Sequence, residues 1–469
     1  MSSRPATLGQ LKESGWESVP VKEEVRRNAI RRIAAGQPLV EGVLGYEDTV
    51  LPQLENALLA GHDVIFLGER GQAKTRIIRS LTALLDEWIP IVSGSEILDD
   101  PYCPVSRHAR DLVEHKGDET PISWVHRDDR FGEKLATPDT SIADLIGEVD
   151  PIKVAEGRYL SDELTLHYGL VPRTNRGIFA INELPDLSER IQVGLLNVLE
   201  ERDIQVRGYK IRLPLDVMLV ASANPEDYTN RGRIITPLKD RFGAQIRTHY
   251  PLDVETEIEV IDQEASPLRP DSVRVEVPRY MSEIVATISQ LARQSPHINQ
   301  RSGVSVRLSV ANYETMVASA VRRALRLGEP EAVPRITDLE ALPASTAGKV
   351  EVESIDEGRD GHVIERLVQQ SVLSVFKATV PGEKLRAASG DFDGGEVVHA
   401  GDDVPAATLA AYLEQFPGLR EVVTSLPGLS GKESPAALAS ATEFVLEGLH
   451  LSKRLNKDAA GARATYRAR

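Results

Sequence analysis

Residues 68–75 have the residue types and the spacing of a phosphate-binding loop. They follow the apolar run Val64-Ile65-Phe66-Leu67 and read Gly68, Glu69, Arg70, Gly71, Gln72, Ala73, Lys74 and Thr75. The two glycines let the backbone turn tightly, Lys74 can reach the outer phosphates of a nucleotide, and Thr75 can offer a hydroxyl to Mg²⁺. Ala73 stands where the pattern has its last glycine. An ordinary glycine turn is the alternative, but Lys-Thr at the required spacing favours the phosphate-binding loop.

Asn182 and Glu183 directly follow a second buried strand, Gly177 to Ile181. Residues at this end of a parallel strand face the ligand crevice. In P-loop nucleoside triphosphatases the two positions carry an Asp that binds Mg²⁺ and a Glu that can polarise the attacking water. We expect Glu183 to activate water. Asn182 keeps a hydrogen-bond acceptor on the Mg²⁺ side but has no charge, so we expect weaker Mg²⁺ binding. The alternative is a strand that simply ends in solvent.

Two more polar residues end predicted elements further along the chain. Asn224 follows the strand Val217 to Ala221 and could orient a water beside Glu183, although an Asn before Pro also suits a turn. Arg241 ends a short predicted helix, before the strand Gln245 to Thr248. Taken alone, this arginine would be an ordinary surface residue.

The elements around these residues predict an alternation of helices and parallel strands. The helix after the phosphate-binding loop has one apolar face, and the segment Val43-Leu44-Gly45 leads into another helix that we expect to cover the base. A further amphipathic helix follows Glu183, and residues 204–213 predict a hairpin with Gly208 at its turn. The apolar positions of the helix after the loop are Ile77, Ile78, Leu81, Leu84 and Leu85. Those of the helix after Glu183 are Ile191, Leu195, Val198 and Leu199.

Residues 91–147 form a long excursion between the loop helix and the Asn182 strand. We interpret it as a surface insertion with a strand at Ile122 to Val125. Its cysteine and histidines could suggest a metal site, but their spacing fits no common zinc pattern. These residues are Cys103, His108, His115 and His126.

The pattern changes after Pro251, where amphipathic helices replace the buried strands. We expect an N-terminal helical appendage at 1–40, an αβα nucleotide-binding domain at 41–250, a helical lid at 251–330, a linker or loop at 331–362, and a mainly helical region at 363–469. The third lid helix, Val304 to Leu327, carries Arg307 in its first turn, just off the core stripe. The tail from Lys453 to Arg469 has six basic residues, and we expect it to be solvated and mobile.

Composition limits the classes of protein. The chain has 469 residues, with 41% hydrophobic and 27% charged residues, which is typical of a globular protein with several domains. The formal net charge of −16 makes a broad nucleic-acid surface unlikely, and no apolar run predicts a membrane span or a signal peptide. A single cysteine suits a reducing compartment, so we expect a cytoplasmic protein.

Taken together, these motifs resemble the AAA+ ATPases, and within them the clade of the MoxR ATPases and magnesium chelatase subunit I. Ala73 before Lys-Thr is itself a MoxR-like variant, and the resemblance covers about residues 41–330. It rests on residues 68–75 and on Asp99-Asp100-Pro101-Tyr102, Ala143-Asp144-Leu145-Ile146-Gly147, Asn175-Arg176-Gly177, Ala223-Asn224-Pro225-Glu226 and Leu238-Lys239-Asp240-Arg241-Phe242-Gly243.

The resemblance implies an α/β P-loop domain with a helical lid, which binds ATP and Mg²⁺ at the boundaries of a ring, commonly a hexamer. Carried over by position, Lys74 and Thr75 bind phosphates and Mg²⁺, Glu183 is the catalytic base and Asn224 the first sensor. Arg241 would be the finger that reaches the neighbour's γ-phosphate, with Arg231 or Arg233 as the next candidates, and Arg307 the lid sensor. Residues 148–172 would be the clade's insertion. Asn182 departs from the pattern.

Three functions are compatible with this resemblance. The first is an ATP-driven motor or chaperone that remodels an unknown protein client or assists metal insertion, with a von Willebrand factor A domain protein as its partner. The second is a ring assembly protein that binds nucleotide and scarcely hydrolyses it, as Asn182 could allow. The third is an enhancer-type transcription activator. The chain lacks the Gly-Ala-Phe-Thr-Gly-Ala loop of that class and is acidic.

Overall fold

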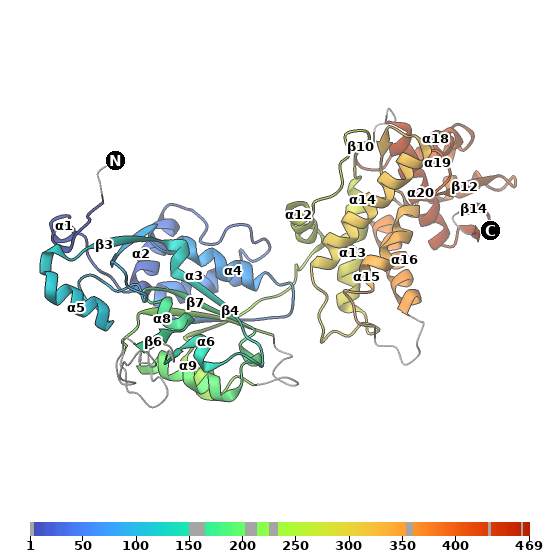
Figure 1. Cartoon of the computed structure of the whole chain (residues 1–469). Coiled ribbons are helices and arrows are strands. Elements are labelled where there is room, and N and C mark those ends of the chain that lie inside the picture. Colours follow the sequence, from blue (N-terminus) through green and yellow to red (C-terminus); the bar gives the residue numbers. More distant parts are fainter. Residues whose placement is uncertain are drawn as a thin grey trace. The chain divides into compact units, whose positions relative to one another are not determined.

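The computed structural model describes residues 4–149, 165–201, 213–224, 233–352, 360–429, 433–460 and 463–469. The chain divides into two compact units, Met1–His249 and Tyr250–Arg469, and each is described by itself (Figure 1). Within the described ranges, none of the helices combines the length and the apolar character that a membrane crossing requires.

A parallel β-sheet is the centre of the first unit. Within its described residues the sheet has the order β4-β7-β8-β1-β9, and all of its neighbouring strands are parallel. The strands are β4 (Phe131–Leu135), β7 (Gly177–Asn182), β8 (Val217–Ala223), β1 (Val64–Leu67) and β9 (Ala244–Arg247). Strands β1 and β7 are buried along their whole length, as the apolar runs predict. The α/β class expected from the sequence is confirmed.

Helices cover both faces of this sheet. On one face, Ile178 and Ala180 pack with apolar residues of α2, α3 and α4. On the other, Phe179 and Ile181 pack with residues of α6, α8, α9 and α11, so alternate residues of one strand serve two cores. The helices are α1 (Leu8–Glu13), α2 (Val21–Ala34), α3 (Val50–Ala60), α4 (Lys74–Ser80), α5 (Arg107–Lys116), α6 (Ile142–Leu145), α8 (Leu170–Arg173), α9 (Glu189–Glu201) and α11 (Thr236–Arg241).

The excursion at 91–147 is more than a surface insertion, and in this respect our interpretation was wrong. It contributes β4 to the central sheet, because the backbone of Phe131–Leu135 pairs with β7. The expected strand near Ile122 is present as β3 (Ile122–His126), which pairs with β2 (Trp88–Val92). Strands β5 (Gly147–Val149) and β6 (Leu166–Tyr168) form a further pair.

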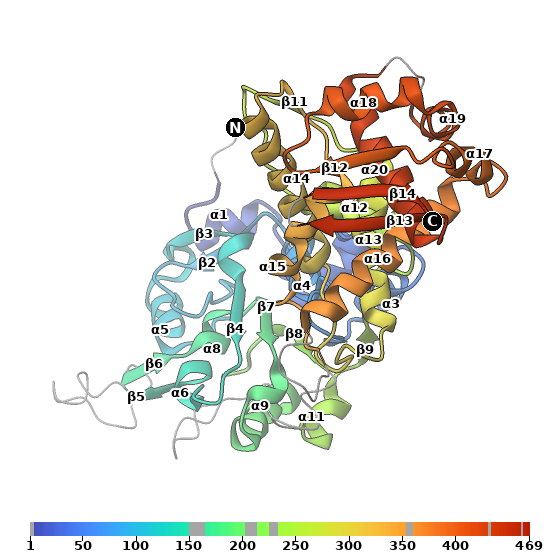
Figure 2. The same cartoon turned by 90° about the vertical axis from the view of Figure 1, so that its right-hand side faces the viewer.

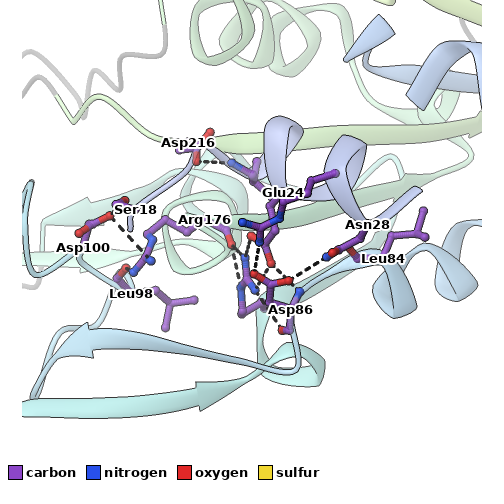
Figure 3. A network of polar contacts seen from close by, with 12 residues as sticks. Ser18, Glu24, Asn28, Leu84, Asp86, Leu98, Asp100, Arg176 and Asp216 are labelled. Atoms are coloured by element: carbon purple, nitrogen blue, oxygen red, sulfur yellow. Dashed lines mark hydrogen bonds and ion pairs between the residues drawn. The ribbon is translucent and has the colours of Figure 1, made fainter. Parts of the chain in front are cut away.

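The N-terminal helix α2 is part of the first unit rather than an appendage. Its Glu24 carboxylate accepts two hydrogen bonds from the Arg130 guanidinium, at 2.8 and 2.6 Å, and both side chains are buried. Figure 3 shows the surrounding network, in which the Asn28 amide donates to the Leu84 carbonyl and the Asp216 carboxylate accepts from the Val21 N–H at the start of α2. Burial lowers the pKa of Arg176, which belongs to the same network.

The second unit is mainly helical, with a small antiparallel sheet, β12-β14-β13, beside α20 (Figure 2). Its elements are α12 (Val254–Glu264), β10 (Arg274–Val275), α13 (Arg279–Gln294), α14 (Arg307–Leu327), β11 (Glu331–Ala332), α15 (Leu342–Thr346), α16 (Asp360–Thr379), α17 (Leu385–Gly390), β12 (Val397–Gly401), α18 (Ala406–Gln415), α19 (Pro417–Thr424), α20 (Pro435–Leu451), β13 (Leu455–Ala460) and β14 (Arg463–Ala468).

One hydrophobic core joins the expected lid to the C-terminal region, from Ile258 to Tyr466. The segment expected as a linker, 331–362, is packed in its first part, because Ile336, Leu339 and Leu342 are buried in that core. The described residues after Lys453 form strands β13 and β14 rather than the mobile tail expected from the sequence. Strand β14 directs Tyr466 into the core, where only 2% of its surface is exposed.

Candidate nucleotide-binding site

The phosphate-binding loop connects β1 to α4 and is held in place by its neighbours. The Gly68 N–H donates to the Ala223 carbonyl at the end of β8, at 3.1 Å. Only glycine fits at this position, because a Cβ atom would collide with the side chains of Thr248 and Gln72. Gly71 and Ala73 both have left-handed backbones, with φ of 77° and 53°. The loop therefore has its curved path even though alanine replaces the last glycine.

The Lys74 ammonium lies within this loop. Its side chain is buried, and Nζ donates to the Glu69 carbonyl at 2.8 Å and to the Gly68 carbonyl. Backbone carbonyls stabilise the ammonium here, and the same position suits the outer phosphates of a nucleotide. Thr75, in the first turn of α4, is partly exposed, and Arg70 is exposed.

Gln72 and Tyr46 stabilise the loop, a role that the sequence interpretation missed. The Gln72 Oε1 atom accepts from the Glu69 N–H at 3.0 Å and from the Thr248 hydroxyl at 2.7 Å. The Tyr46 hydroxyl lies within hydrogen-bond distance of the carbonyls of Gln72 and His249, at 3.0 and 2.7 Å, and its one proton is shared between these two acceptors. Burial raises the pKa of Tyr46 to about 12, so the hydroxyl remains a donor at neutral pH.

Residues 43–45 lie beside the loop helix. Val43 is buried in the core that contains Ile77 and Ile78 of α4, and Leu44 is half-buried. Gly45 has a left-handed φ of 78°, which favours glycine. The Arg76 guanidinium donates to the Gly42 carbonyl at 2.9 Å and connects this segment to α4. The expected position at the base of the nucleotide stays a prediction.

The polar residues at the ends of β7 and β8 lie at the same edge of the sheet as the loop. The Asn182 Oδ1 atom accepts from the Ser222 hydroxyl at 3.2 Å, and Glu183 donates its N–H to that hydroxyl oxygen at 3.3 Å. Glu183 is partly exposed and has a left-handed φ of 55°. Asn224 follows β8 and is buried. Because parallel strands end at one edge, these residues and Lys74 lie at the same edge of the sheet.

Glu133 of β4 also contacts this edge and was not among the residues predicted from the sequence. Its Oε1 atom accepts a hydrogen bond of 2.5 Å from the Asn182 amide. Its Oε2 atom accepts from Arg79 Nε of α4 at 2.8 Å. The local sequence, Phe-Gly-Glu-Lys-Leu, lacks the apolar run that identified the other strands.

Arg241 is exposed at the end of α11, where a residue that serves a neighbouring subunit would have to be. Gln192 of α9 positions the start of this helix, because its side chain accepts from the Ile235 N–H and donates to the Arg233 carbonyl. Of the two reserve candidates, Arg233 is exposed and Arg231 lies outside the described residues.

The remaining predicted positions do not belong to the described site of the first unit. Arg307 belongs to the second unit, where it is exposed as the first residue of α14. Most of the insertion at 148–172 and nearly all of the hairpin at 204–213 lie outside the described residues. Among the described residues there is no group of three His, Cys, Asp or Glu that could hold a metal ion.

The described residues fit a nucleotide with its Mg²⁺ ion. The loop has a curved backbone with a buried ammonium at its centre. Oxygen atoms, which Mg²⁺ prefers, are present on Thr75, Asn182 and Glu133. Bound Mg²⁺ would neutralise charge on the phosphates during hydrolysis.

Comparison with known proteins finds relatives of this chain. A family model described as the sigma-54 interaction domain matches residues 156–241. The magnesium-chelatase 38 kDa subunit of Cereibacter sphaeroides is 32% identical over 211 residues, which are 42% of this chain and 54% of that protein. The subunit of the same name from Rhodobacter capsulatus is 31% identical over 232 residues, 47% of this chain and 58% of that protein.

The chain thus spans little more than half of the length of these two relatives. Among solved structures, a cryo-EM-based model of the complex between the magnesium chelatase subunits BchI and BchD is similar, with 23% identity and a TM-score of 0.35. The match covers 70% of this chain and 98% of that chain.

Proposed function

Because this chain carries an AAA+ P-loop domain of the magnesium chelatase subunit I clade, we propose that it is a ring-forming motor that binds and hydrolyses ATP. The motor remodels a protein partner or assists metal insertion, as in the MoxR and chelatase types. Its ring is a hexamer, its partner carries a von Willebrand factor A domain, and it works in the cytoplasm.

One observation supports hydrolysis most strongly: three neighbouring strands bring the required groups to one edge of the sheet. Strand β1 leads to Lys74, β7 to Glu183 and β8 to Asn224. In this proposal Lys74 and Thr75 bind the phosphates and Mg²⁺, Glu183 takes a proton from the attacking water, and Asn224 orients that water. Arg241 completes the site of a neighbouring subunit, and Arg307 senses the nucleotide from the lid.

Replacement of Lys74 tests the nucleotide site. We expect Lys74→Ala to lose tight ATP binding, because the ammonium offsets the charge of the outer phosphates. Binding of a fluorescent ATP analogue is measured for the wild-type chain, for Lys74→Ala and for Lys116→Ala, which removes an exposed lysine from α5. Wild-type affinity in Lys74→Ala would contradict the proposal. Equal losses in both variants would point to a general effect of charge.

Asn182 favours one alternative, a ring assembly protein that binds ATP and scarcely hydrolyses it. An amide on the Mg²⁺ side carries no charge, so it could allow binding with slow turnover. Steady-state phosphate release by the assembled ring separates the two functions. Turnover that saturates with ATP and disappears in Lys74→Ala favours the motor, whereas tight binding without turnover favours the assembly protein.

The match to the sigma-54 interaction domain favours a transcription activator as a second alternative. The formal net charge of −16 opposes it, because DNA binding relies on contacts between basic side chains and phosphates. A footprint on DNA at moderate salt would support this alternative.

A further inference from the structure

Asn182 is in direct contact with a carboxylate of the neighbouring strand. The Asn182 side chain is 8% exposed, and its two polar atoms have different partners. Oδ1 accepts from the Ser222 hydroxyl at 3.2 Å, and Nδ2 donates to Glu133 Oε1 at 2.5 Å. A negative charge therefore lies one hydrogen bond away from the position where the amide replaces an acidic side chain.

The strand register places Glu133 on the face that the loop helix covers. In the parallel pair β4 and β7, Glu133 is opposite Ala180 and Leu135 is opposite Asn182. Paired residues of neighbouring strands share a face, and so do residues two apart on one strand. Ala180 packs in the same core as Ile77 and Ile78 of α4. The Glu133 side chain thus lies on the α4 side of the sheet.

Arg79 links this carboxylate to the loop helix. Its Nε and Nη2 atoms donate to the two Glu133 oxygens at 2.8 and 3.2 Å. Arg79 is four residues after Thr75 on α4, so the two side chains share a helix face. The Arg79 side chain is 64% exposed and the Glu133 side chain 20%, and an ion pair with one partner largely in solvent contributes little stability. Glu133 can therefore exchange this partner for another cation at little cost.

We propose that Glu133 is the Mg²⁺-side carboxylate of the nucleotide site and supplies, from β4, the negative charge that Asn182 lacks. This inference rests on the proposed nucleotide site. Glu133 holds the hydrated Mg²⁺ ion that accompanies ATP, while its hydrogen bond orients the Asn182 amide. Arg79 is the counter-ion of Glu133 when no Mg²⁺ is bound.

The test measures how much Mg²⁺ is needed for ATP binding. Binding of the fluorescent ATP analogue is measured first in EDTA and then with increasing Mg²⁺. We expect Glu133→Gln to bind the analogue like the wild-type chain in EDTA and to require roughly 10- to 100-fold more Mg²⁺ for the same gain in affinity. Arg79→Gln, which removes the counter-ion but keeps the carboxylate, should require no more Mg²⁺ than the wild-type chain.

A charge exchange gives a second test. Glu133→Gln combined with Asn182→Asp returns a carboxylate to β7, and we expect it to recover the wild-type Mg²⁺ requirement. An unchanged requirement in Glu133→Gln would overturn the inference. Equal losses in Glu133→Gln and Arg79→Gln would also overturn it, because they would show that the ion pair only holds β4 to α4.

The controls separate this inference from the proposed function. If the wild-type chain does not bind the analogue, or if Lys74→Ala binds it equally well, the nucleotide site itself is wrong. If Lys74→Ala loses binding and Glu133→Gln keeps the wild-type Mg²⁺ requirement, only the role of Glu133 is wrong. Thermal unfolding midpoints of all variants show whether each has folded.

Discussion

Two residues of the candidate site have backbones that side chains other than glycine rarely adopt. Ala73 and Glu183 have φ angles of 53° and 55°, a conformation that costs roughly 1 kcal/mol or more for such residues. Both are at the point where a strand or loop gives way to a helical turn.

Replacement of Glu183 tests its role as a base. We expect Glu183→Gln to bind ATP like the wild-type chain and to hydrolyse it roughly 10²- to 10⁴-fold more slowly, because an amide cannot take up a proton from water. Phosphate release and nucleotide binding are measured on the same preparation. The control is Glu189→Gln, an exposed carboxylate of α9, which should keep wild-type turnover. Loss of binding in Glu183→Gln would instead mean that the side chain is structural.

The residues of the site that were predicted from the sequence are those next to strong patterns. Glycines and a Lys-Thr pair after an apolar run identify the loop, and a polar pair after a buried strand identifies Asn182 and Glu183. Glu133 and the supporting role of Gln72 were missed because both depend on contacts with residues distant in the sequence. Gln72 meets Thr248, and Glu133 meets Asn182.

At the scale of elements, a buried ion pair attaches α2 to the central unit. Glu24 of α2 and Arg130 are both buried, and the Arg130 Nε and Nη2 atoms also donate to the Arg176 carbonyl. Removal of one partner from such a pair leaves the other as a buried charge without compensation.

We expect Glu24→Ala to lower the free energy of unfolding of the first unit by about 3–5 kcal/mol. Glu23→Ala removes an exposed carboxylate that pairs with Arg26 on the same helix, and it should change this free energy by roughly 0.5 kcal/mol or less. The chain's three tryptophans, Trp16, Trp88 and Trp124, all belong to the first unit. Urea unfolding followed by tryptophan fluorescence therefore reports on this unit. Equal effects of the two substitutions would contradict the role of the buried pair.

Most elements were predicted well where the apolar periodicity is strong. The elements that were not predicted, such as β13 and β14, have weak apolar periodicity. The strands β1, β7 and β8 and the long helices of the second unit follow apolar runs or stripes. Strands β13 and β14 have many polar residues, and only alternation such as Ala464, Tyr466 and Ala468 could have indicated a strand. Basic residues on the opposite positions of β14 led us to expect a mobile tail.

At the scale of the whole molecule, the second unit contains a cluster of buried charged residues. Glu443 of α20 accepts from the Thr337 N–H at 3.1 Å and lies 3.8 Å from Arg335. Burial raises the pKa of Glu443 to about 7, although Arg335 and Arg323 oppose this shift and Asp338 adds to it. The folded unit therefore holds a proton on Glu443 that the unfolded chain releases above its ordinary pKa of 4.5.

The stability from this proton is complete below about pH 4.5 and is lost as the pH rises through about 7. Between pH 5 and pH 8 this loss lowers the free energy of unfolding of the wild-type chain by about 3 kcal/mol. We expect Glu443→Gln to lack this decrease. Urea unfolding followed by far-UV circular dichroism detects this unit, which has no tryptophan. The same pH dependence in the variant and the wild-type chain would contradict the assignment.

The division of the chain into units could be predicted only in part. A change from buried strands to amphipathic helices is visible near Pro251 in the sequence. The shared core of α13, α16 and α20 is not visible there, because each helix has its own apolar stripe and nothing local identifies its partner. For the same reason residues 331–362 were expected to form a linker, although Ile336, Leu339 and Leu342 pack within this core.

The central claim is that ATP is hydrolysed at sites completed by a neighbouring subunit, and Arg241 tests it most directly. A finger supplied in trans can contribute roughly 10³- to 10⁵-fold in rate. We expect Arg241→Ala to bind ATP normally and to hydrolyse it poorly, whereas Lys239→Ala, on the same short helix, should keep wild-type turnover.

The decisive measurement is phosphate release by mixed rings of Arg241→Ala and Glu183→Gln subunits, with co-assembly shown independently. Each variant alone should be inactive. In mixed rings some interfaces pair an intact Glu183 with an intact Arg241 of the neighbour, so we expect part of the activity to return. Wild-type turnover by Arg241→Ala alone would contradict the claim.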